Sequence, residues 1–175
     1  MSRGEILARV YLALGSNLEN PVKQLNQALQ TLEKLSAVPI IHSDFYISKA
    51  LGPQSQPDYI NAVALIQTQD EAFTLLKKLQ KIEVNQGRNR NAERWGARTL
   101  DLDILLYDQL ILRTPSLTIP HKEMLKRVFV LCPLYEIAPN LILPDQTDIK
   151  SAIDKLDQAG LNTNLQRTHL FNQAK

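Results

Sequence analysis

The chain has 175 residues and a formal net charge of only +2, which is too small for a protein that mainly neutralises nucleic-acid phosphates. Hydrophobic residues make up 44% of the chain, but no apolar run approaches the length that crosses a membrane, and the N-terminus is a poor signal peptide. A single cysteine, Cys132, excludes a disulfide within the chain. Length, charge and hydropathy together therefore predict one cytoplasmic domain with no nucleic-acid or membrane partner.

The first part of the chain predicts a strand, a helix and two further strands. Residues 9–14 are almost wholly apolar and predict a buried strand. Asn20 is followed by proline, which suits a helix cap and a first helical position, and apolar residues then recur at helical spacing up to Leu32. Residues 41–48 alternate and the run 59–66 is apolar, so we expect two strands paired as a hairpin. One face of the first hairpin strand is predicted to carry Ile41, Ser43, Phe45 and Ile47.

The second part predicts a helix, a loop, a strand and several short helices. Asp70 predicts the cap of a helix that reaches about Asn85 and has an apolar face made of Phe73, Leu76, Leu79 and Ile82. Residues 87–98 indicate an exposed loop, and residues 100–107 predict a strand. Short helices are expected after Pro120, at 129–137 and at 151–159, and a loosely held tail at 161–175. The order β-α-β-β-α-β predicts an α+β, ferredoxin-like antiparallel sheet with helices on one face, followed by short C-terminal helices.

Asp101 and Asp103 lie two positions apart inside an otherwise apolar strand. Strand side chains alternate, so both carboxylates are expected on one face. In a central strand, where we expect them, two such charges repel each other and resist desolvation, and a hard cation removes both penalties. Mg²⁺ fits, because it takes carboxylate oxygens and keeps waters and phosphate oxygens as its other ligands. The alternatives are a solvated face, or aspartates that pair with arginines.

Arginines are concentrated just before this strand, at Arg88, Arg90, Arg94 and Arg98. Guanidinium groups fork onto phosphate oxygens, so arginines beside a carboxylate–metal centre suit a polyphosphate. Trp95 could close over a flat ligand, or instead anchor the loop to the core. The chain contains no glycine-rich P-loop and no dinucleotide-binding fingerprint, so phosphate binding has to come from side chains.

Other candidates each have a structural alternative. Tyr59 and Asn61 share a strand face, where an amide can exchange hydrogen bonds with the edge of a heterocycle, or simply form a half-buried pair. His121 follows a proline and could bind a phosphate, although a lone histidine is more often an ordinary turn residue. Phe129 by itself indicates a core position.

Distinctive stretches occur in order over roughly residues 9–145. They are Leu14-Gly15-Ser16-Asn17-Leu18, Leu51-Gly52-Pro53-Gln54, Gln56-Pro57-Asp58-Tyr59-Ile60-Asn61, Gln86-Gly87-Arg88, Ile119-Pro120-His121 and Pro133-Leu134. The longest and most specific is Arg94-Trp95-Gly96-Ala97-Arg98-Thr99-Leu100-Asp101-Leu102-Asp103-Ile104. Together they resemble the 6-hydroxymethyl-7,8-dihydropterin pyrophosphokinase family.

The resemblance implies one ferredoxin-like α+β domain at 1–160, a tail without an assigned role at 161–175, and one reaction. The hydroxyl of 6-hydroxymethyl-7,8-dihydropterin would attack the β-phosphorus of ATP, giving the pterin diphosphate and AMP in folate biosynthesis. Two Mg²⁺ ions held by Asp101 and Asp103 would bridge the phosphates and the hydroxyl. A strong base is unnecessary if the metal lowers the pKa of the hydroxyl, and Asp101 is the candidate if one exists. We expect a monomer.

The resemblance also implies a role for each matching residue. Arg88 and Arg98 would neutralise the triphosphate and act with Asp101 and Asp103 as the catalytic set. The pterin would be bound by Ser48, Leu51, Tyr59, Asn61, Trp95 and Phe129. The ATP-binding set would be Gln80, Glu83, Arg88, Trp95, Arg98, Ile104, Thr118, His121, Lys122 and Arg127. The chain departs from the family pattern at Lys49-Ala50, Ser116 and Lys122, where a proline pair, an arginine and a tyrosine are common.

Two rival functions use the same fold. Ferredoxin-like sheets also bind RNA, and arginines interleaved with Trp95 suit a single strand, but no aromatic-rich RNA-binding motif occurs and the net charge is nearly zero. A small-molecule-binding regulatory domain fits the fold but leaves the pair of aspartates unexplained.

Overall fold

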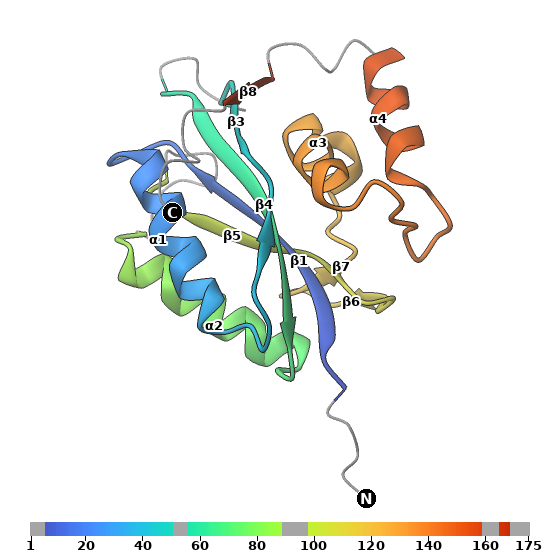
Figure 1. Cartoon of the computed structure of the whole chain (residues 1–175), viewed down its shortest axis with the longest axis horizontal. Coiled ribbons are helices and arrows are strands. Elements are labelled where there is room, and N and C mark those ends of the chain that lie inside the picture. The colour runs from blue at the N-terminus through green and yellow to red at the C-terminus, as the bar shows by residue number, and fades with distance from the viewer. Residues whose placement is uncertain (1–5, 51–55, 89–97, 159–164, 169–175) are drawn as a thin grey trace, which may run out of the picture.

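The structure is a computed structural model that describes residues 6–50, 56–88, 98–158 and 165–168. At its centre is an antiparallel sheet with strands in the order β5-β1-β4-β3-β8, and the short β2 also pairs with β4 (Figure 1). The strands are β1 Ala8–Ser16, β2 Ile41–His42, β3 Phe45–Ser48, β4 Tyr59–Thr68, β5 Asp101–Tyr107 and β8 Gln166–Thr168. The order of β5, β1, β4 and β3 is that of a split-βαβ, ferredoxin-like sheet, which confirms the predicted fold class.

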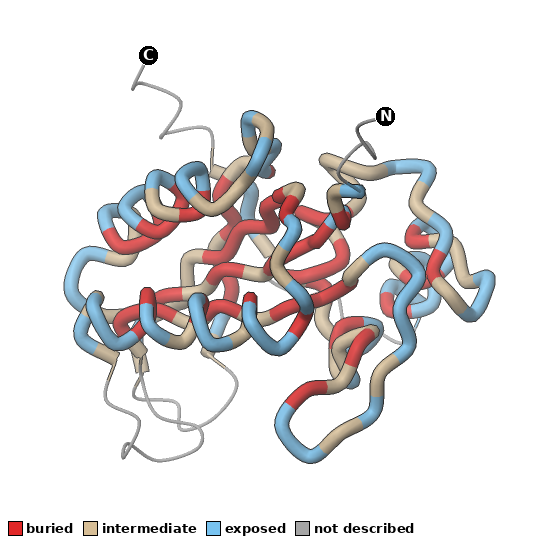
Figure 2. The backbone as a smooth tube through the Cα atoms, turned by 90° about the horizontal axis from the view of Figure 1, so that it is seen from below, coloured by how far each residue is buried: buried red, intermediate tan, exposed pale blue. Residues whose placement is uncertain are grey.

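Helices cover both faces of this sheet, whereas the sequence predicted them on one. On one face lie α1 Pro21–Glu33 and α2 Ala72–Asn85, and on the other lie α3 Val128–Ile137 and α4 Ile149–Gln158. The second layer follows from β4, because residues 61–66 are buried at every position rather than at alternate ones. Figure 2 shows buried positions along the strands and on the helix sides that face them. The short C-terminal helices were predicted, but not that they complete a second core.

The predicted hairpin forms, but its first strand is interrupted. Ile41 pairs with Leu65 and Tyr46 pairs with Asn61, so the register shifts by one residue between β2 and β3. A shift of one residue moves every later side chain to the opposite face. Ile41 therefore faces the α3 side of the sheet and Phe45 the α1 side, and the prediction that they share a face is wrong.

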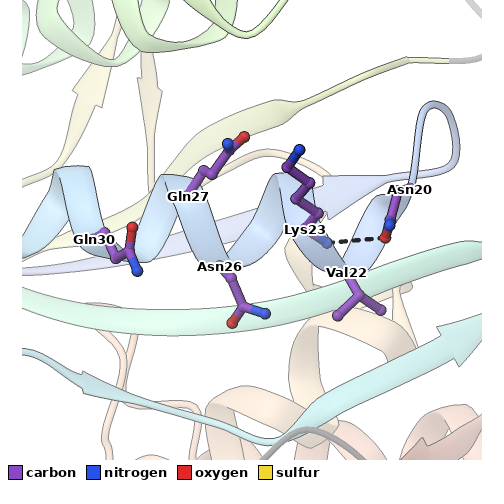
Figure 3. Close-up of a pocket in the computed structure, with 6 residues that line it drawn as sticks. All are labelled: Asn20, Val22, Lys23, Asn26, Gln27 and Gln30. Atoms are coloured by element: carbon purple, nitrogen blue, oxygen red, sulfur yellow. Dashed lines mark hydrogen bonds between the residues drawn. The ribbon is translucent and has the colours of Figure 1, made fainter. Parts of the chain in front are cut away.

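The start of α1 follows its sequence. Asn20 accepts a hydrogen bond from the backbone N of Lys23 at 3.2 Å, and proline occupies the first turn, which confirms the predicted cap (Figure 3). The buried residues of α1 include Leu25, Leu29 and Leu32, as the spacing predicted.

The start of α2 differs from its prediction. The helix begins after Glu71, whose side chain makes no capping bond, while the carboxylate of Asp70 binds Lys78 Nζ at 2.6 Å. Phe73 is 42% exposed, because the inward face is instead Ala72, Leu75, Leu79 and Ile82. Successive residues in a helix are rotated by about 100°, so an apolar face predicted one position too late places Phe73 toward solvent.

The end of the chain also has more structure than predicted. After β5 come a small hairpin of β6 Leu112–Arg113 and β7 Thr118–Ile119, the 3-10 helix η1 Met124–Lys126, and then α3 and α4. Within the segment expected to be a loose tail, β8 pairs with β3 and adds an edge strand to the sheet. Across the described residues, no helix is both long enough and apolar enough to cross a membrane.

Candidate active site

Asp101 and Asp103 lie on one face of β5, as the alternation predicted. Their neighbour Leu102 is 3% exposed and packs in the core under α1 and α2, on the opposite face. The strand stands at the edge of the sheet in the order of strands, not at its centre as expected. The two carboxylates are partly accessible, with 27% of the Asp101 side chain and 39% of the Asp103 side chain exposed.

Two arginines converge on Asp101. Arg88 Nη1 lies 2.8 Å from Asp101 Oδ1, and Arg98 Nη1 lies 2.8 Å from Asp101 Oδ2. Arg88 Nη1 also contacts Glu83 Oε1, which accepts a hydrogen bond from the backbone N of Leu102 at 2.8 Å. Burial raises the pKa of Glu83, which is 2% exposed. Asp101 is thus paired with arginines, which is one of the alternatives that the sequence left open. Both of its carboxylate oxygens accept from guanidinium groups, so in this structure neither oxygen is placed to take a proton from a substrate.

Asp103 has no such partner within hydrogen-bond distance among the described residues. The nearest cationic candidate is His121, whose Nε2 lies 3.8 Å from Asp103 Oδ2. Burial and the nearby charge of Asp101 raise the pKa of Asp103 to about 7. Burial and the charge of Arg127 lower the pKa of His121, so a neutral imidazole adds no compensating charge. Asp103 is therefore a partly exposed acid whose charged form is disfavoured and which lacks a close cation among the described residues.

The candidate pterin residues lie on the same face of the sheet. Ser48 pairs with Tyr59 across β3 and β4, and Asn61 Nδ2 donates to Ser48 Oγ at 2.9 Å and to the carbonyl of Tyr46 at 3.2 Å. Phe129 packs in the core of this face from the first turn of α3. The other two candidates, Leu51 and Trp95, lie outside the described residues.

One row of paired residues connects these groups. Asn61 pairs with Gly15, and Gly15 pairs with Asp101 on the next strand. A Cβ on Gly15 would lie 3.6 Å from Asn61 Oδ1 and 3.7 Å from Tyr59 Cδ1. The glycine therefore leaves space between the amide oxygen and the acidic pair.

The remaining nucleotide candidates are less concentrated. Arg127 lies with its guanidinium 6.0 Å from the centre of the Phe129 ring. Ile104 is 2% exposed and packs in the core, so its side chain is not available to a ligand in this structure. The others are placed on separate elements: Gln80 on α2, Thr118 on β7, and His121 and Lys122 just after β7.

Asn17, to which the sequence assigned no role beyond membership of a family motif, anchors Arg98. Its Oδ1 accepts a hydrogen bond from the backbone N of Arg98 at 2.8 Å, and its own backbone N donates to the carbonyl of Arg98 at 3.1 Å. Its Nδ2 also donates to the carbonyl of Pro57 at 3.1 Å. A polar turn residue that is only 2% exposed needs such partners, but exposure cannot be read from the sequence.

A separate hollow of about 570 Å³ lies along the surface of α1 (Figure 3). Its lining comes from the helix and its cap: Asn20, Val22, Lys23, Asn26, Gln27 and Gln30. None of these residues was a site candidate, and the hollow does not include the acidic pair.

Fold and site together define a ferredoxin-like α+β protein with a carboxylate–arginine cluster of the kind that handles polyphosphates. Residues 11–139 match the family model described as 7,8-dihydro-6-hydroxymethylpterin-pyrophosphokinase (HPPK). The chain belongs to this family.

Curated relatives agree with this assignment. A 2-amino-4-hydroxy-6-hydroxymethyldihydropteridine pyrophosphokinase of Haemophilus influenzae is 53% identical over 144 residues, which cover 82% of this chain and 89% of the relative. A protein of the same description from Pseudomonas aeruginosa is 48% identical and covers 80% of this chain and 86% of that relative.

Solved structures show a similar fold. Plasmodium falciparum HPPK-DHPS, crystallised with pteroate, has a TM-score of 0.71 at 12% identity and covers 95% of this chain. The chain spans only 47% of that protein, about half of its length. At this identity the likeness concerns the fold alone.

Proposed function

We propose that the protein transfers the pyrophosphoryl group of ATP to the hydroxyl of 6-hydroxymethyl-7,8-dihydropterin, as a step of folate biosynthesis. The hydroxyl oxygen would bond to the β-phosphorus and lose its proton, while the bond from that phosphorus to the oxygen of the departing AMP breaks. The observation that carries the proposal is the shared face of the sheet, where the Asp101–Asp103 pair and its arginines lie beside Tyr59 and Asn61 in a member of this family.

Asp101 and Asp103 would hold Mg²⁺. Within the described residues the possible ligands do not form a group of three or more, and Mg²⁺ accepts a site of one or two carboxylates completed by water and phosphate oxygens. The raised pKa of Asp103 supports the fit, because a cation would offset the burial and the repulsion from Asp101 that disfavour its charged form. When bound, the metal supplies Lewis-acid stabilisation of phosphate charge.

Arg88 and Arg98 would exchange partners when ATP binds. Both guanidiniums now neutralise Asp101, and phosphate oxygens offer them the same forked hydrogen bonding. Their transfer to the triphosphate would free Asp101 for the metal. Asn17 would keep Arg98 at this position by its bonds to the backbone on both sides of the residue. Positioning and charge stabilisation of this kind are most of what phosphoryl transfer requires.

The pterin would lie over Gly15, beside Asn61. Because Asn61 Nδ2 is used by Ser48 and the backbone of β3, its Oδ1 is the atom presented to a ring NH group. Tyr59 and Phe129 would supply aromatic contact from opposite elements, with Leu51 and Trp95 completing the pocket. Gln80, Glu83, Thr118, His121, Lys122 and Arg127 would frame the nucleotide, and Ile104 would contribute only its backbone.

The direct test is product analysis. Purified protein incubated with ATP, Mg²⁺ and 6-hydroxymethyl-7,8-dihydropterin should release AMP in proportion to the pterin consumed, and no AMP when the pterin is omitted. Formation of ADP, or no turnover, would reject the proposed reaction. Action as a cytoplasmic monomer is part of the same proposal, and its oligomeric state can be checked by light scattering.

A further inference from the structure

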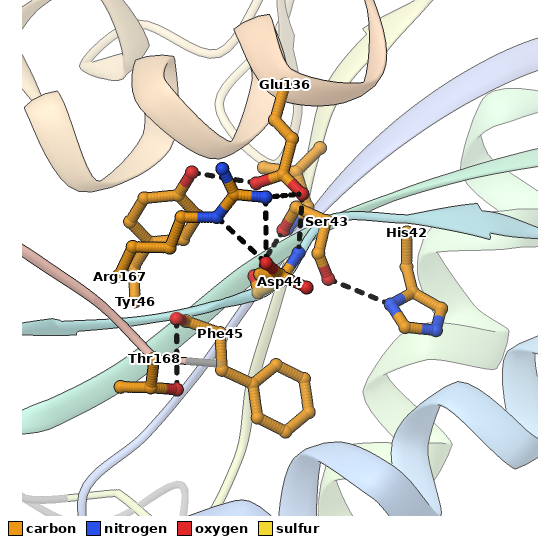
Figure 4. Close-up of polar contacts among 9 residues, drawn as sticks. His42, Ser43, Asp44, Phe45, Tyr46, Glu136, Arg167 and Thr168 are labelled. Carbon is orange, nitrogen blue, oxygen red and sulfur yellow. Dashed lines mark hydrogen bonds and ion pairs between the residues drawn. The ribbon is translucent and has the colours of Figure 1, made fainter. Parts of the chain in front are cut away.

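The C-terminal strand β8 carries an arginine that joins two elements of the fold. Arg167 Nε donates to Asp44 Oδ2 at 2.8 Å, and its Nη2 lies 2.8 Å from the same oxygen (Figure 4). The same Nη2 donates to Glu136 Oε1 at 3.2 Å. Asp44 directly precedes β3 and Glu136 is in the last turn of α3, so one guanidinium binds both elements.

Glu136 makes further bonds to the same strand. Its Oε1 accepts from the backbone N of Asp44 at 3.0 Å, and its Oε2 accepts from the hydroxyl of Tyr46 at 2.7 Å. Burial and the Glu136 carboxylate raise the pKa of Tyr46 above its ordinary range, so this hydroxyl keeps its proton as a donor. We call Asp44, Tyr46, Glu136 and Arg167 the tail cluster.

The tail cluster adjoins the proposed pterin pocket through the sheet register. Arg167 pairs with Tyr46, and Tyr46 pairs with Asn61, so the three side chains form one row on the face covered by α3. The carbonyl of Tyr46 also accepts a hydrogen bond from Asn61 Nδ2 at 3.2 Å. Any shift of β3 at this point therefore changes the orientation of the Asn61 amide.

The other wall of the pocket depends on the same cluster. Phe129 and Glu136 lie on α3 seven residues apart, which is about 10 Å along a helix. Because both residues belong to one helix, which continues through Pro133, the bonds at Glu136 limit how far α3 can move relative to β3 and β4. The tail cluster thus connects the strand that orients Asn61 to the helix that carries Phe129.

Resting on the proposed function, we infer that Arg167 is a positioning residue for the pterin: it fixes β3 against α3 and so sets the spacing between the Asn61 amide and the Phe129 ring. Strand β8, in the segment without an assigned role, would thus help to shape the substrate pocket without touching the substrate. Both carboxylates that Arg167 binds are mostly shielded, with 16% and 21% of their side chains exposed. Removing the guanidinium leaves two negative charges facing each other, which favours separation of β3 from α3.

The experiment measures binding of two ligands separately in the full-length chain. Fluorescence titration with 6-hydroxymethylpterin and with a non-hydrolysable ATP analogue plus Mg²⁺ is compared for the wild type and Arg167→Ala. Because one misoriented hydrogen bond can weaken binding by about tenfold, we expect the Kd for the pterin to rise by about that factor. The Kd for the nucleotide should rise by less than about threefold, since only Arg127 among its described proposed residues directly adjoins α3 and the described tail-cluster contacts do not reach the acidic pair.

Two matched variants keep the result interpretable. Lys150→Ala removes an exposed ion pair with Asp154 on α4 and should change neither Kd. Arg167→Lys retains the positive charge but not the forked guanidinium, so its pterin Kd should lie between those of the wild type and Arg167→Ala. It also provides the test if Arg167→Ala does not fold.

A double substitution identifies the route of the effect. If Arg167 acts through Asn61, then Arg167→Ala should weaken pterin binding much less in an Asn61→Ala background than in the wild type. A pterin Kd within twofold of wild type for Arg167→Ala, equal weakening of both ligands, or fully additive effects would each overturn the inference. If Asn61→Ala itself leaves pterin binding unchanged, the proposed pterin site fails instead.

Discussion

Two carboxylate–arginine clusters stand at opposite ends of one row of paired residues. The row runs from Arg167 on β8 through Tyr46, Asn61 and Gly15 to Asp101 on β5. In the tail cluster, one guanidinium lies within 3.2 Å of both carboxylates. In the cluster of the proposed active site, Asp101 has two guanidiniums at 2.8 Å. The nearest cationic candidate for Asp103 in the described chain is a histidine at 3.8 Å.

The difference shows how similar residues serve different purposes. Carboxylates that each have a guanidinium within hydrogen-bond distance, like those of the tail cluster, hold elements together and gain less from a ligand. A carboxylate whose charged form is disfavoured and that has no close cation in the described chain, like Asp103, gains stability from a bound metal. The following experiments test this contrast, beginning with the largest expected effect.

Asp103→Asn should abolish most turnover while leaving the fold intact. Loss of one charge-stabilising group at such a centre typically costs about 100- to 1000-fold, and we expect the upper end of this range. The measurement is the rate of AMP formation, with far-UV circular dichroism to verify folding. Asp154→Asn, an exposed aspartate on α4, is the matched control. A rate within tenfold of wild type would remove Asp103 from the proposed metal site.

Arg98→Ala should lower turnover by about 100-fold, because the phosphate charge that this guanidinium balances in the transition state is left uncompensated. Arg98→Lys should recover only part of the rate, since an ammonium group cannot make the fork. Steady-state AMP release at saturating substrates measures both variants. Arg9→Ala, near the opposite end of β1, is the control. Turnover of Arg98→Ala within threefold of wild type would contradict the transfer of this arginine to phosphate.

Tyr46→Phe should affect stability rather than chemistry. The variant loses one hydrogen bond to the Glu136 carboxylate, which is worth about 1.5 kcal/mol of unfolding free energy when the acceptor is charged. The bond from Asn61 goes to the backbone of Tyr46 and is retained, so turnover should stay within twofold. Urea unfolding and AMP release are measured on the same preparation. A fall in turnover of more than twofold would show that the Tyr46 hydroxyl, and not only the Tyr46 backbone, positions the pterin.

The smallest expected effect is a pH dependence of stability that comes from Asp103 in the proposed active site. The folded pKa of Asp103, about 7, lies above its ordinary value of 3.8, so the folded state holds a proton that the unfolded chain releases. The associated stability is present below about pH 4 and is lost as the pH rises to about 7. In EDTA, the Tm of Asp103→Asn should therefore exceed that of the wild type by about 3 °C at pH 8, after allowance for solvent screening, and by little at pH 4. Parallel Tm curves across this range would refute the raised pKa.

Local patterns in the sequence predicted much of the fold. The helix start at Asn20, the order of strands and helices along the chain up to residue 107, and the common face of Asp101 and Asp103 all follow from short-range spacing. The errors at Asp70 and Phe73 concern where a helix begins, which depends on contacts beyond the helix itself. The resemblance to the family supplied the ligand roles, which the structure leaves as proposals.

Long-range pairing was decided only in three dimensions. Nothing near Arg167 in the sequence indicates that it binds Asp44 and Glu136, and nothing near Asn17 indicates that it holds Arg98. Alternation within a strand is a property of adjacent residues, so the sequence by itself determined that the two aspartates point the same way. The packing of distant segments decides which strand stands at the edge, which arginine meets which carboxylate, and where β8 joins the sheet. Local sequence patterns do not specify the free energy of that packing.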